Sequence, residues 1–164
     1  SEMCIRDRSL CFDYLRTHNL EVRIARIFNT YGPRMAKNDG RVVSNFVCQS
    51  LLNESITIFG EGSQTRSFCY VDDLIEGFLK MMDSSCPGPI NLGNPNEISI
   101  YELATKIKNK INCNLNLAYK PLPEDDPKQR RPDISRAKEI LNWEPKIDID
   151  LGLDLTIKYF KSIV

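Results

Sequence analysis

Apolar residues recur every three or four positions in several stretches of the chain, which is the spacing of one buried face of a helix. In residues 99–112, Leu103, Ile107 and Ile111 share one face and lysines occupy the other. The same spacing predicts further helices over residues 9–18, 40–53, 72–83, 134–143 and 151–160. Shorter stretches rich in β-branched and aromatic residues predict strands over residues 21–28, 55–62, 67–71, 90–94 and 116–120.

This mixture of helices and strands predicts an α/β fold, and it puts one polar loop where such folds bind ligands. Residues 21–28 (EVRIARIF) predict a buried strand that runs directly into the loop NTYGPR (29–34). Ligands of open α/β sheets bind outside the carboxyl ends of the strands. A tight turn explains Gly32 and Pro33 but not the polar residues around them. We therefore interpret this loop as a site for phosphate or sugar hydroxyls.

The charge balance argues against a general attraction to polyanions. The 164 residues include 22 basic and 22 acidic side chains, which gives no net pull toward nucleic acid or an anionic membrane. No apolar run reaches the roughly 18 residues of a transmembrane helix, and we expect no leader peptide. The cysteines show neither a C-x-x-C pair nor a zinc or disulfide spacing, so we expect a cytoplasmic protein without a metal site.

Three further polar groups interrupt the apolar pattern. Arg66, in GEGSQTRSF (60–68), precedes a strand that enters the core, and its guanidinium there would grip a diphosphate through two hydrogen bonds. The basic run KQRRPD (128–133) is, by composition, a solvated face. Asp72 and Asp73 open a predicted helix, and we interpret them as its N-cap rather than as catalytic acids.

Several motifs together resemble the carboxyl half of the extended short-chain dehydrogenase/reductase enzymes that act on nucleotide sugars. They are RIFNTYGPRM, DGRVVSNF, ITIFGEGSQTRSFCYVDDLIEG, INLGNP and RRPDISRAKEILNWEP. The resemblance is greatest to the UDP-glucuronate decarboxylases and runs from about Ser9 to the last residue. It implies the carboxyl-terminal part of a Rossmann-like NAD-binding fold plus a small mixed α/β substrate-binding domain. Residues 9–35 would end the Rossmann domain, and residues 36–164 would mostly form the nucleotide-sugar-binding domain, with some segments returning to the Rossmann sheet.

The resemblance also implies roles for the polar clusters, with NAD as cofactor and a UDP-sugar as substrate. Thr30 and Arg41 would contact NAD. Arg66 would hold the diphosphate or the carboxylate-bearing sugar, and it is the one candidate for a catalytic contribution. The other substrate-binding residues would be Tyr14, Asn29, Val43, Asn45, Phe46, Phe59 and Arg130, with Phe59 near the uridine and Arg130 near the phosphates.

In the family reaction, oxidation at C4 of the glucuronate gives a 4-keto sugar, and carbon dioxide leaves because the ketone takes up the electron pair as an enolate. Reduction then gives UDP-xylose. The base is the tyrosine of a Tyr-x-x-x-Lys motif, whose pKa the lysine lowers. The family pattern puts that lysine at position 4, where this chain has Cys4, and the tyrosine just before residue 1. We therefore expect residues 1–8 (SEMCIRDR), which resemble a translated sequencing adapter, to be non-native and this chain to be inactive alone.

Relatives form homodimers through a helix bundle that includes the helix ending at His18, and the resemblance implies the same for the parent protein. Two alternatives to the decarboxylase stay open. One is an NAD-dependent 4,6-dehydratase or 4-epimerase on the same scaffold. The other is a non-catalytic module that binds a UDP-sugar.

Overall fold

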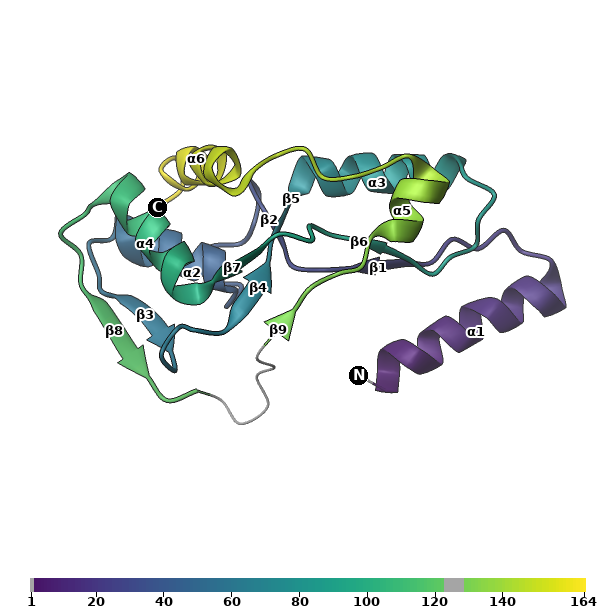
Figure 1. The fold of residues 1–164 in the computed structure, drawn as a ribbon, viewed down its shortest axis with the longest axis horizontal. Coiled ribbons are helices and arrows are strands. Elements are labelled where there is room, and N and C mark those ends of the chain that lie inside the picture. The colour runs from purple at the N-terminus through teal and green to yellow at the C-terminus, as the bar shows by residue number, and fades with distance from the viewer. Residues whose placement is uncertain (1, 123–128) are drawn as a thin grey trace.

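The computed structural model describes the backbone of residues 2–122 and 129–164 and the side chains of residues 5–122 and 131–164. Its helices are α1 (Glu2–His18), α2 (Val42–Leu51), α3 (Val71–Asp83), α4 (Ile100–Ile111), α5 (Ser135–Leu141) and α6 (Ile149–Phe160). Its strands are β1 (Ala25–Ile27), β2 (Thr30–Tyr31), β3 (Ile56–Phe59), β4 (Thr65–Ser67), β5 (Cys69–Tyr70), β6 (Ile90–Leu92), β7 (Glu97–Ser99), β8 (Leu117–Lys120) and β9 (Gln129–Arg130). Figure 1 shows their arrangement.

The strands pair mostly in parallel, as expected for an α/β fold. β1 pairs with β6, β2 with β5 and β3 with β8, each in the parallel direction. β4 lies between β7, which is antiparallel to it, and β9, which is parallel. The predicted α/β class is therefore confirmed as a mixed α/β fold with parallel strands.

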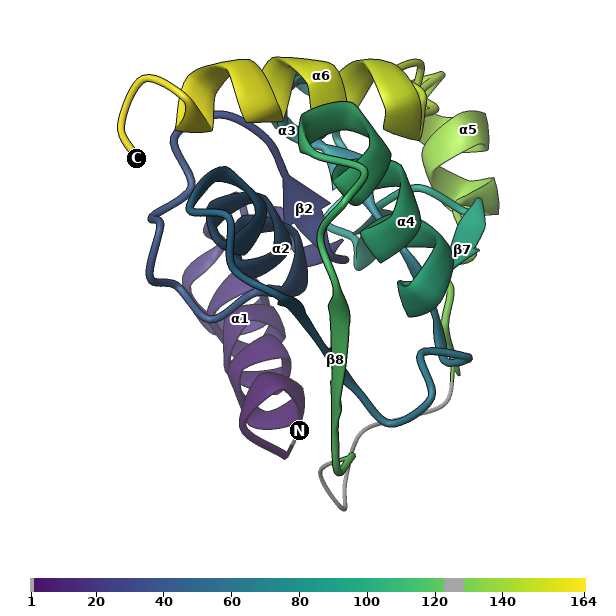
Figure 2. The same cartoon turned by 90° about the vertical axis from the view of Figure 1, so that its left-hand side faces the viewer.

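Two hydrophobic clusters hold these elements together. The larger cluster lies among α2, α4, α6 and β3, the elements gathered at one end of the molecule in Figures 1 and 2. The second lies among α3, α5 and β6 and includes Trp143, which is almost completely buried. Burial of these apolar faces explains why the helical periodicity predicted α3 and α4 to within a residue or two of their observed bounds.

The predicted buried strand at residues 21–28 is largely wrong. Only residues 25–27 form a strand, and the side chain of Ile27 is 57% exposed. The reason is that β1 has a described partner strand on one edge only, β6, and Ala25 is its only residue that is not exposed. Helix α1 lies at the same side of the molecule, away from β3 and β8, with Leu10 and Tyr14 exposed (Figure 1).

The predicted N-cap role of Asp72 or Asp73 is also wrong. Helix α3 begins one residue earlier than expected, with Tyr70 at the N-cap position and no side-chain cap. Both acids lie in the first turn, where their charge favours the helix dipole. The buried Asp73 carboxylate instead accepts hydrogen bonds from the backbone N–H groups of Lys146 (3.1 Å) and Ile147 (3.0 Å). Asp73 thus joins α3 to the segment before α6.

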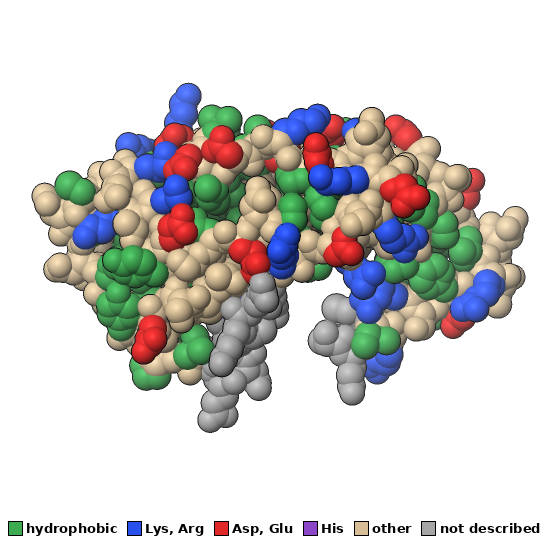
Figure 3. All heavy atoms as spheres, in the orientation of Figure 1, with side chains coloured by type: hydrophobic (Ala, Val, Ile, Leu, Met, Phe, Trp, Pro, Cys, Tyr) green, Lys and Arg blue, Asp and Glu red, His purple; other side chains and the backbone are tan. Residues whose placement is uncertain are grey.

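Three short strands, β2, β7 and β9, have no counterpart in the sequence-based prediction. β2 lies within residues 29–34, which were expected to be a loop. β9 lies within residues 121–133, which the proline and charge content predicted to be a loop, and residues 123–128 of that loop lie outside the described part. On the face of the molecule that Figure 3 shows, acidic and basic side chains are interspersed rather than separated. Among the described residues, no helix has the length and apolar character that crossing a bilayer requires.

Candidate functional site

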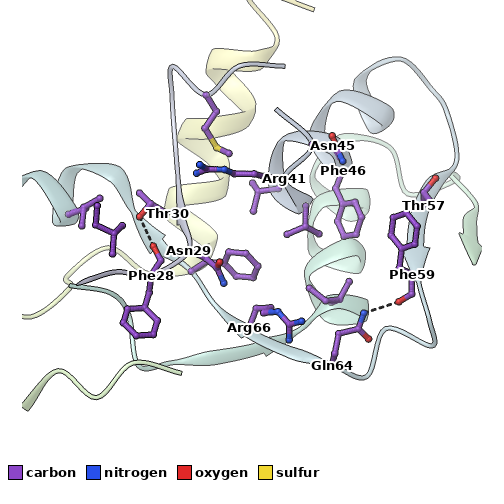
Figure 4. Close-up of a pocket in the computed structure, with 18 residues that line it drawn as sticks. Phe28, Asn29, Thr30, Arg41, Asn45, Phe46, Thr57, Phe59, Gln64 and Arg66 are labelled. Carbon is purple, nitrogen blue, oxygen red and sulfur yellow. Dashed lines mark hydrogen bonds between the residues drawn. The ribbon is translucent and has the colours of Figure 1, made fainter. Parts of the chain in front are cut away.

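A cleft of about 900 Å³ opens where the segment after β1 meets the start of α2 and the strands β3 and β4. Most of the residues that the sequence singled out line it, and Figure 4 shows how they face one another across the opening. They are Asn29, Thr30, Arg41, Val43, Asn45, Phe46, Phe59 and Arg66. The fold therefore brings polar residues from widely separated stretches of the sequence into one cleft.

The loop that follows β1 is fixed by both neighbouring strand pairs. Phe28 donates its backbone N–H to Leu92 at the end of β6 (3.1 Å), and the Asn29 carbonyl accepts from the N–H of Cys69 in β5 (2.8 Å). The Asn29 side chain donates to the Ser67 carbonyl at 3.3 Å, and the Thr30 hydroxyl donates to the Phe28 carbonyl at 2.9 Å. The polar loop thus lies at the carboxyl end of a parallel strand, as the sequence predicted.

Arg66 is a buried cation on the wall of the cleft. It lies in β4, is 7% exposed, and donates from Nη1 to the Thr65 carbonyl at 2.7 Å. In the register of the sheet, Arg66 pairs with Arg130 of β9. A guanidinium at low exposure attracts an anionic group strongly, because little water screens its charge. This wall suits a phosphate or carboxylate.

The amino terminus of α2 forms another part of the wall. Arg41 is the N-cap residue, and its side chain makes no cap hydrogen bond, while the first turn contains no acidic residue. The Asp39 carboxylate accepts from the Arg41 N–H (3.0 Å) and from the Ser44 hydroxyl, and it lies 3.8 Å from Arg41 Nε. The Arg41 side chain is 67% exposed, so its charge is available at the mouth of the cleft. Helix dipole and guanidinium both favour an anion here, and Asp39 partly offsets them.

The remaining wall is apolar. Val43 and Phe46 are buried on α2, and the Phe59 ring on β3 is 45% exposed. Figure 4 shows the Phe46 and Phe59 rings on the same side of the cleft. An exposed aromatic ring within a cleft offers a flat surface on which a planar ligand group can stack.

Two predicted site residues are not placed in the cleft by the structure. Tyr14 lies on α1, where its ring packs against His18 with 5.0 Å between centroids, and it is not a lining residue. The backbone of Arg130 lies beside Arg66, but its side chain lies outside the described part of the chain. Their roles in binding remain predictions.

The groups with shifted pKa values in this region are not activated for catalysis. Burial raises the pKa of Tyr31, and burial raises the pKa of the Cys69 thiol to about 12. A phenol or thiol that acts as a base or nucleophile needs a lowered pKa instead. Among the described residues, no group of His, Cys, Asp and Glu side chains has the arrangement of a metal site. Arg66, Arg41 and the exposed Phe59 ring make the cleft suitable for an anionic ligand that carries a planar group.

Sequence reasoning missed several residues of the cleft. Thr57, Gln64, Met35 and Ile100 also line it. Gln64 donates from Nε2 to the Phe59 carbonyl at 2.8 Å (Figure 4). Its position within the polar stretch GEGSQTRSF was the available signal, because Arg66 was the only residue of that stretch to be interpreted.

Comparison with known proteins gives the family. Residues 8–93, just over half of the chain, match the model of the NAD dependent epimerase/dehydratase family. The chain is 53% identical over 156 residues to UDP-glucuronic acid decarboxylase 2 of Arabidopsis thaliana, and 49% identical over 152 residues to UDP-glucuronic acid decarboxylase 1 of Danio rerio. These alignments cover 95% and 93% of the chain but only 35% and 36% of the relatives.

Solved structures agree with this assignment. The UDP-glucuronic acid 4-epimerase of Bacillus cereus, in complex with UDP-glucuronic acid and NAD, superposes with a TM-score of 0.88 at 28% identity and covers 96% of the chain. The UDP-glucose 4-epimerase of Thermotoga maritima, with UDP-glucose, gives a TM-score of 0.87 at 31% identity over 91% of the chain. The chain spans 50% and 48% of these structures. The chain belongs to the NAD dependent epimerase/dehydratase family.

Proposed function

We propose that this chain is the nucleotide-sugar-binding part of an NAD-dependent UDP-glucuronate decarboxylase, which converts UDP-glucuronate to UDP-xylose and carbon dioxide through a 4-keto sugar. The observation that carries the choice of reaction is the identity of 53% over 95% of the chain to a UDP-glucuronic acid decarboxylase. The two epimerase structures described above share 28% and 31% of their aligned residues with it.

In this proposal the cleft binds the substrate. Arg66 pairs with the diphosphate or the glucuronate carboxylate, since a buried guanidinium matches either anion through two hydrogen bonds. Arg130 adds charge for the phosphates. Phe59 carries the uracil ring on its exposed face. Asn29 hydrogen-bonds the sugar, and Val43, Asn45 and Phe46 shape the pocket around it, with Tyr14 as a further contact.

The cofactor side of the cleft is assigned to Thr30 and Arg41. The exposed Arg41 guanidinium beside the α2 amino terminus fits a dinucleotide, because both attract its negative charge. NAD, when bound, would accept a hydride from C4 of the sugar and later return it. We assign the cofactor-binding fold of the parent protein to a Rossmann domain, of which residues 9–35 form the end and to whose sheet β6 returns.

The proposal separates the parent protein from the 164-residue chain. A Tyr-x-x-x-Lys motif does not occur in the 164 residues, so we propose that this chain by itself does not turn over UDP-glucuronate. Because Cys4 stands where the family pattern has the lysine, we also propose that residues 1–8 are non-native. The parent protein would be a homodimer through the helix that ends at His18. A cytoplasmic location remains a prediction.

The test starts with the native gene upstream of the codon for Ser9, which we expect to encode a Tyr-x-x-x-Lys motif and a glycine-rich dinucleotide-binding turn. Its protein product would then be incubated with UDP-glucuronate labelled at the carboxyl carbon. Release of labelled carbon dioxide with UDP-xylose supports the decarboxylase. A product that keeps the carboxylate but has the opposite configuration at C4 would instead identify an epimerase. In a second incubation, with a UDP-hexose, a 4-keto-6-deoxy product would identify a dehydratase. Binding of UDP without turnover in the native product would identify a binding module.

A further inference from the structure

Strand β3 has two edges with different partners. The Ile56 N–H donates to the Asn116 carbonyl (3.0 Å) and the Gly60 N–H to the Lys120 carbonyl (2.8 Å), so the even-numbered residues bond along β8. Backbone groups of successive residues in a strand point to opposite edges. Thr57 and Phe59 therefore direct their N–H and C=O groups away from β8, and both residues line the cleft.

Two glutamine side chains bond this cleft-side edge. Gln49, on α2, accepts the Thr57 N–H at Oε1 (3.0 Å) and donates from Nε2 to the Thr57 hydroxyl (3.2 Å). Gln64, in the turn after β3, donates to the Phe59 carbonyl at 2.8 Å (Figure 4). Each carboxamide occupies the place of a peptide group from a neighbouring strand. The two side chains thus close the edge to strand pairing at both ends.

The groups left on this edge, between the two glutamines, are the Thr57 carbonyl and the Phe59 N–H. Within the described residues neither forms a hydrogen bond with another protein group. In a parallel sheet, the C=O of one residue and the N–H of the residue two positions later both bond the same residue of the next strand. The C=O accepts from that residue's N–H, and the N–H donates to its C=O. The edge is therefore prepared for a single ligand group that carries a donor and an acceptor side by side, next to an exposed aromatic ring.

We propose that Gln49 and Gln64 are positioning residues that fix this edge to receive the imide of the uracil base, with the uracil N3–H donated to the Thr57 carbonyl and a uracil carbonyl accepting from the Phe59 N–H. This inference rests on the proposed function and deepens it, because it names two residues that hold the base-binding edge of β3 in place. Gln49 and Gln64 act through their hydrogen bonds to Thr57 and Phe59, which makes them positioning residues.

The test compares the affinities of the 164-residue chain for UDP and for N3-methyl-UDP by isothermal titration calorimetry. The two ligands share the diphosphate, so their affinity ratio isolates the imide. We expect wild type to prefer UDP by about 10-fold or more, the effect of losing one good hydrogen bond. Gln49→Ala and Gln64→Ala should each reduce this preference to about 2-fold. The exposed Asn116, whose carboxamide lies outside the cleft, gives the matched control Asn116→Ala, which should keep the full preference.

Glutamate substitutions separate positioning from a general effect on folding. In Gln49→Glu the carboxylate still accepts the Thr57 N–H, and the Thr57 hydroxyl can rotate to donate to it, so the preference should persist. In Gln64→Glu the carboxylate has no proton to give to the Phe59 carbonyl, so the preference should be lost. Because both ligands bind the same folded fraction, partial unfolding of a variant lowers both affinities equally and leaves their ratio unchanged.

The outcomes distinguish this inference from the proposed function. A preference for UDP that survives in Gln49→Ala and Gln64→Ala would overturn the positioning role and leave the UDP-sugar site intact. Equal behaviour of the two glutamate variants would also overturn it. If wild type binds neither UDP nor UDP-glucuronate, the proposed substrate site is itself wrong, and the inference fails with it.

Discussion

Replacing Tyr31 by phenylalanine should stabilise the protein, although it removes a polar group from the core. The Tyr31 side chain is 1% exposed and packs edge to face against Phe68 and Tyr70, with 6.3 and 5.7 Å between ring centroids. Its hydroxyl is buried against Gly152 of α6 and has no hydrogen-bond partner within the described residues. An unsatisfied buried hydroxyl costs about 1–3 kcal/mol. Because phenylalanine keeps the ring contacts, we expect Tyr31→Phe to raise the free energy of unfolding by about 1 kcal/mol.

A substitution at Gly152 tests the same contact from the other side. A Cβ at this position would overlap the Tyr31 hydroxyl and lie 2.8 Å from its Cζ. Alanine favours a helix over glycine by about 1 kcal/mol, but overpacking costs roughly 1–3 kcal/mol. We therefore expect Gly152→Ala to lower the free energy of unfolding by about 1 kcal/mol. In the Tyr31→Phe background the nearest overlapping atom is gone, so the double variant should be about 1 kcal/mol more stable than the sum of the single effects.

The assay is urea unfolding followed by the fluorescence of Trp143, with the slope m required to be the same in all variants. A change of 1 kcal/mol should move the melting temperature of a chain of this size by roughly 2–4 °C. A destabilised Tyr31→Phe would mean that the hydroxyl has a partner in solution. Strict additivity of the two substitutions would mean that a methyl group at position 152 does not meet the Tyr31 hydroxyl. Either result would refute the packing described here.

Three further predictions concern single ionised groups. Asp73→Asn replaces a carboxylate that accepts two backbone amides by a carboxamide that can satisfy one of them, so unfolding measurements in urea should show a loss of about 1–3 kcal/mol. Arg66→Ala and Arg66→Lys should both weaken UDP-glucuronate binding by about 10-fold or more in calorimetric titrations, because lysine lacks the two-donor fork; near-wild-type affinity of the lysine variant would exclude bidentate contact. The hydrogen bond from Lys106 lowers the pKa of Asp150 in the folded protein. The contribution of this carboxylate to the free energy of unfolding is therefore complete above its unfolded pKa of about 3.9 and is lost as the pH falls through its folded pKa. The carboxylate is half exposed, and Asp150→Asn should therefore reduce the acid-side loss of stability by less than about 1 kcal/mol; identical acid titrations of the two proteins would contradict this.

The amino-acid sequence predicted the helices best, because an apolar face repeats within a few residues and needs no knowledge of its partner. Helix α4 was expected at residues 99–112 and is found at Ile100–Ile111. The strands were harder. A three-residue strand such as β7 carries no measurable periodicity, and the burial of Ile27 depends on its neighbours in space, which leave it 57% exposed among the described residues.

The sequence by itself also identified the polar loop after β1 and the unusual position of Arg66, since both interrupt an apolar pattern. Only the tertiary structure decided which groups meet. It placed Arg66 beside Arg130 by pairing β4 with β9, turned Asp73 toward the segment before α6, and set Gln49 against the edge of β3. The physical reason is that periodicity is a local property, whereas hydrogen bonds between distant residues depend on how helices and strands pack.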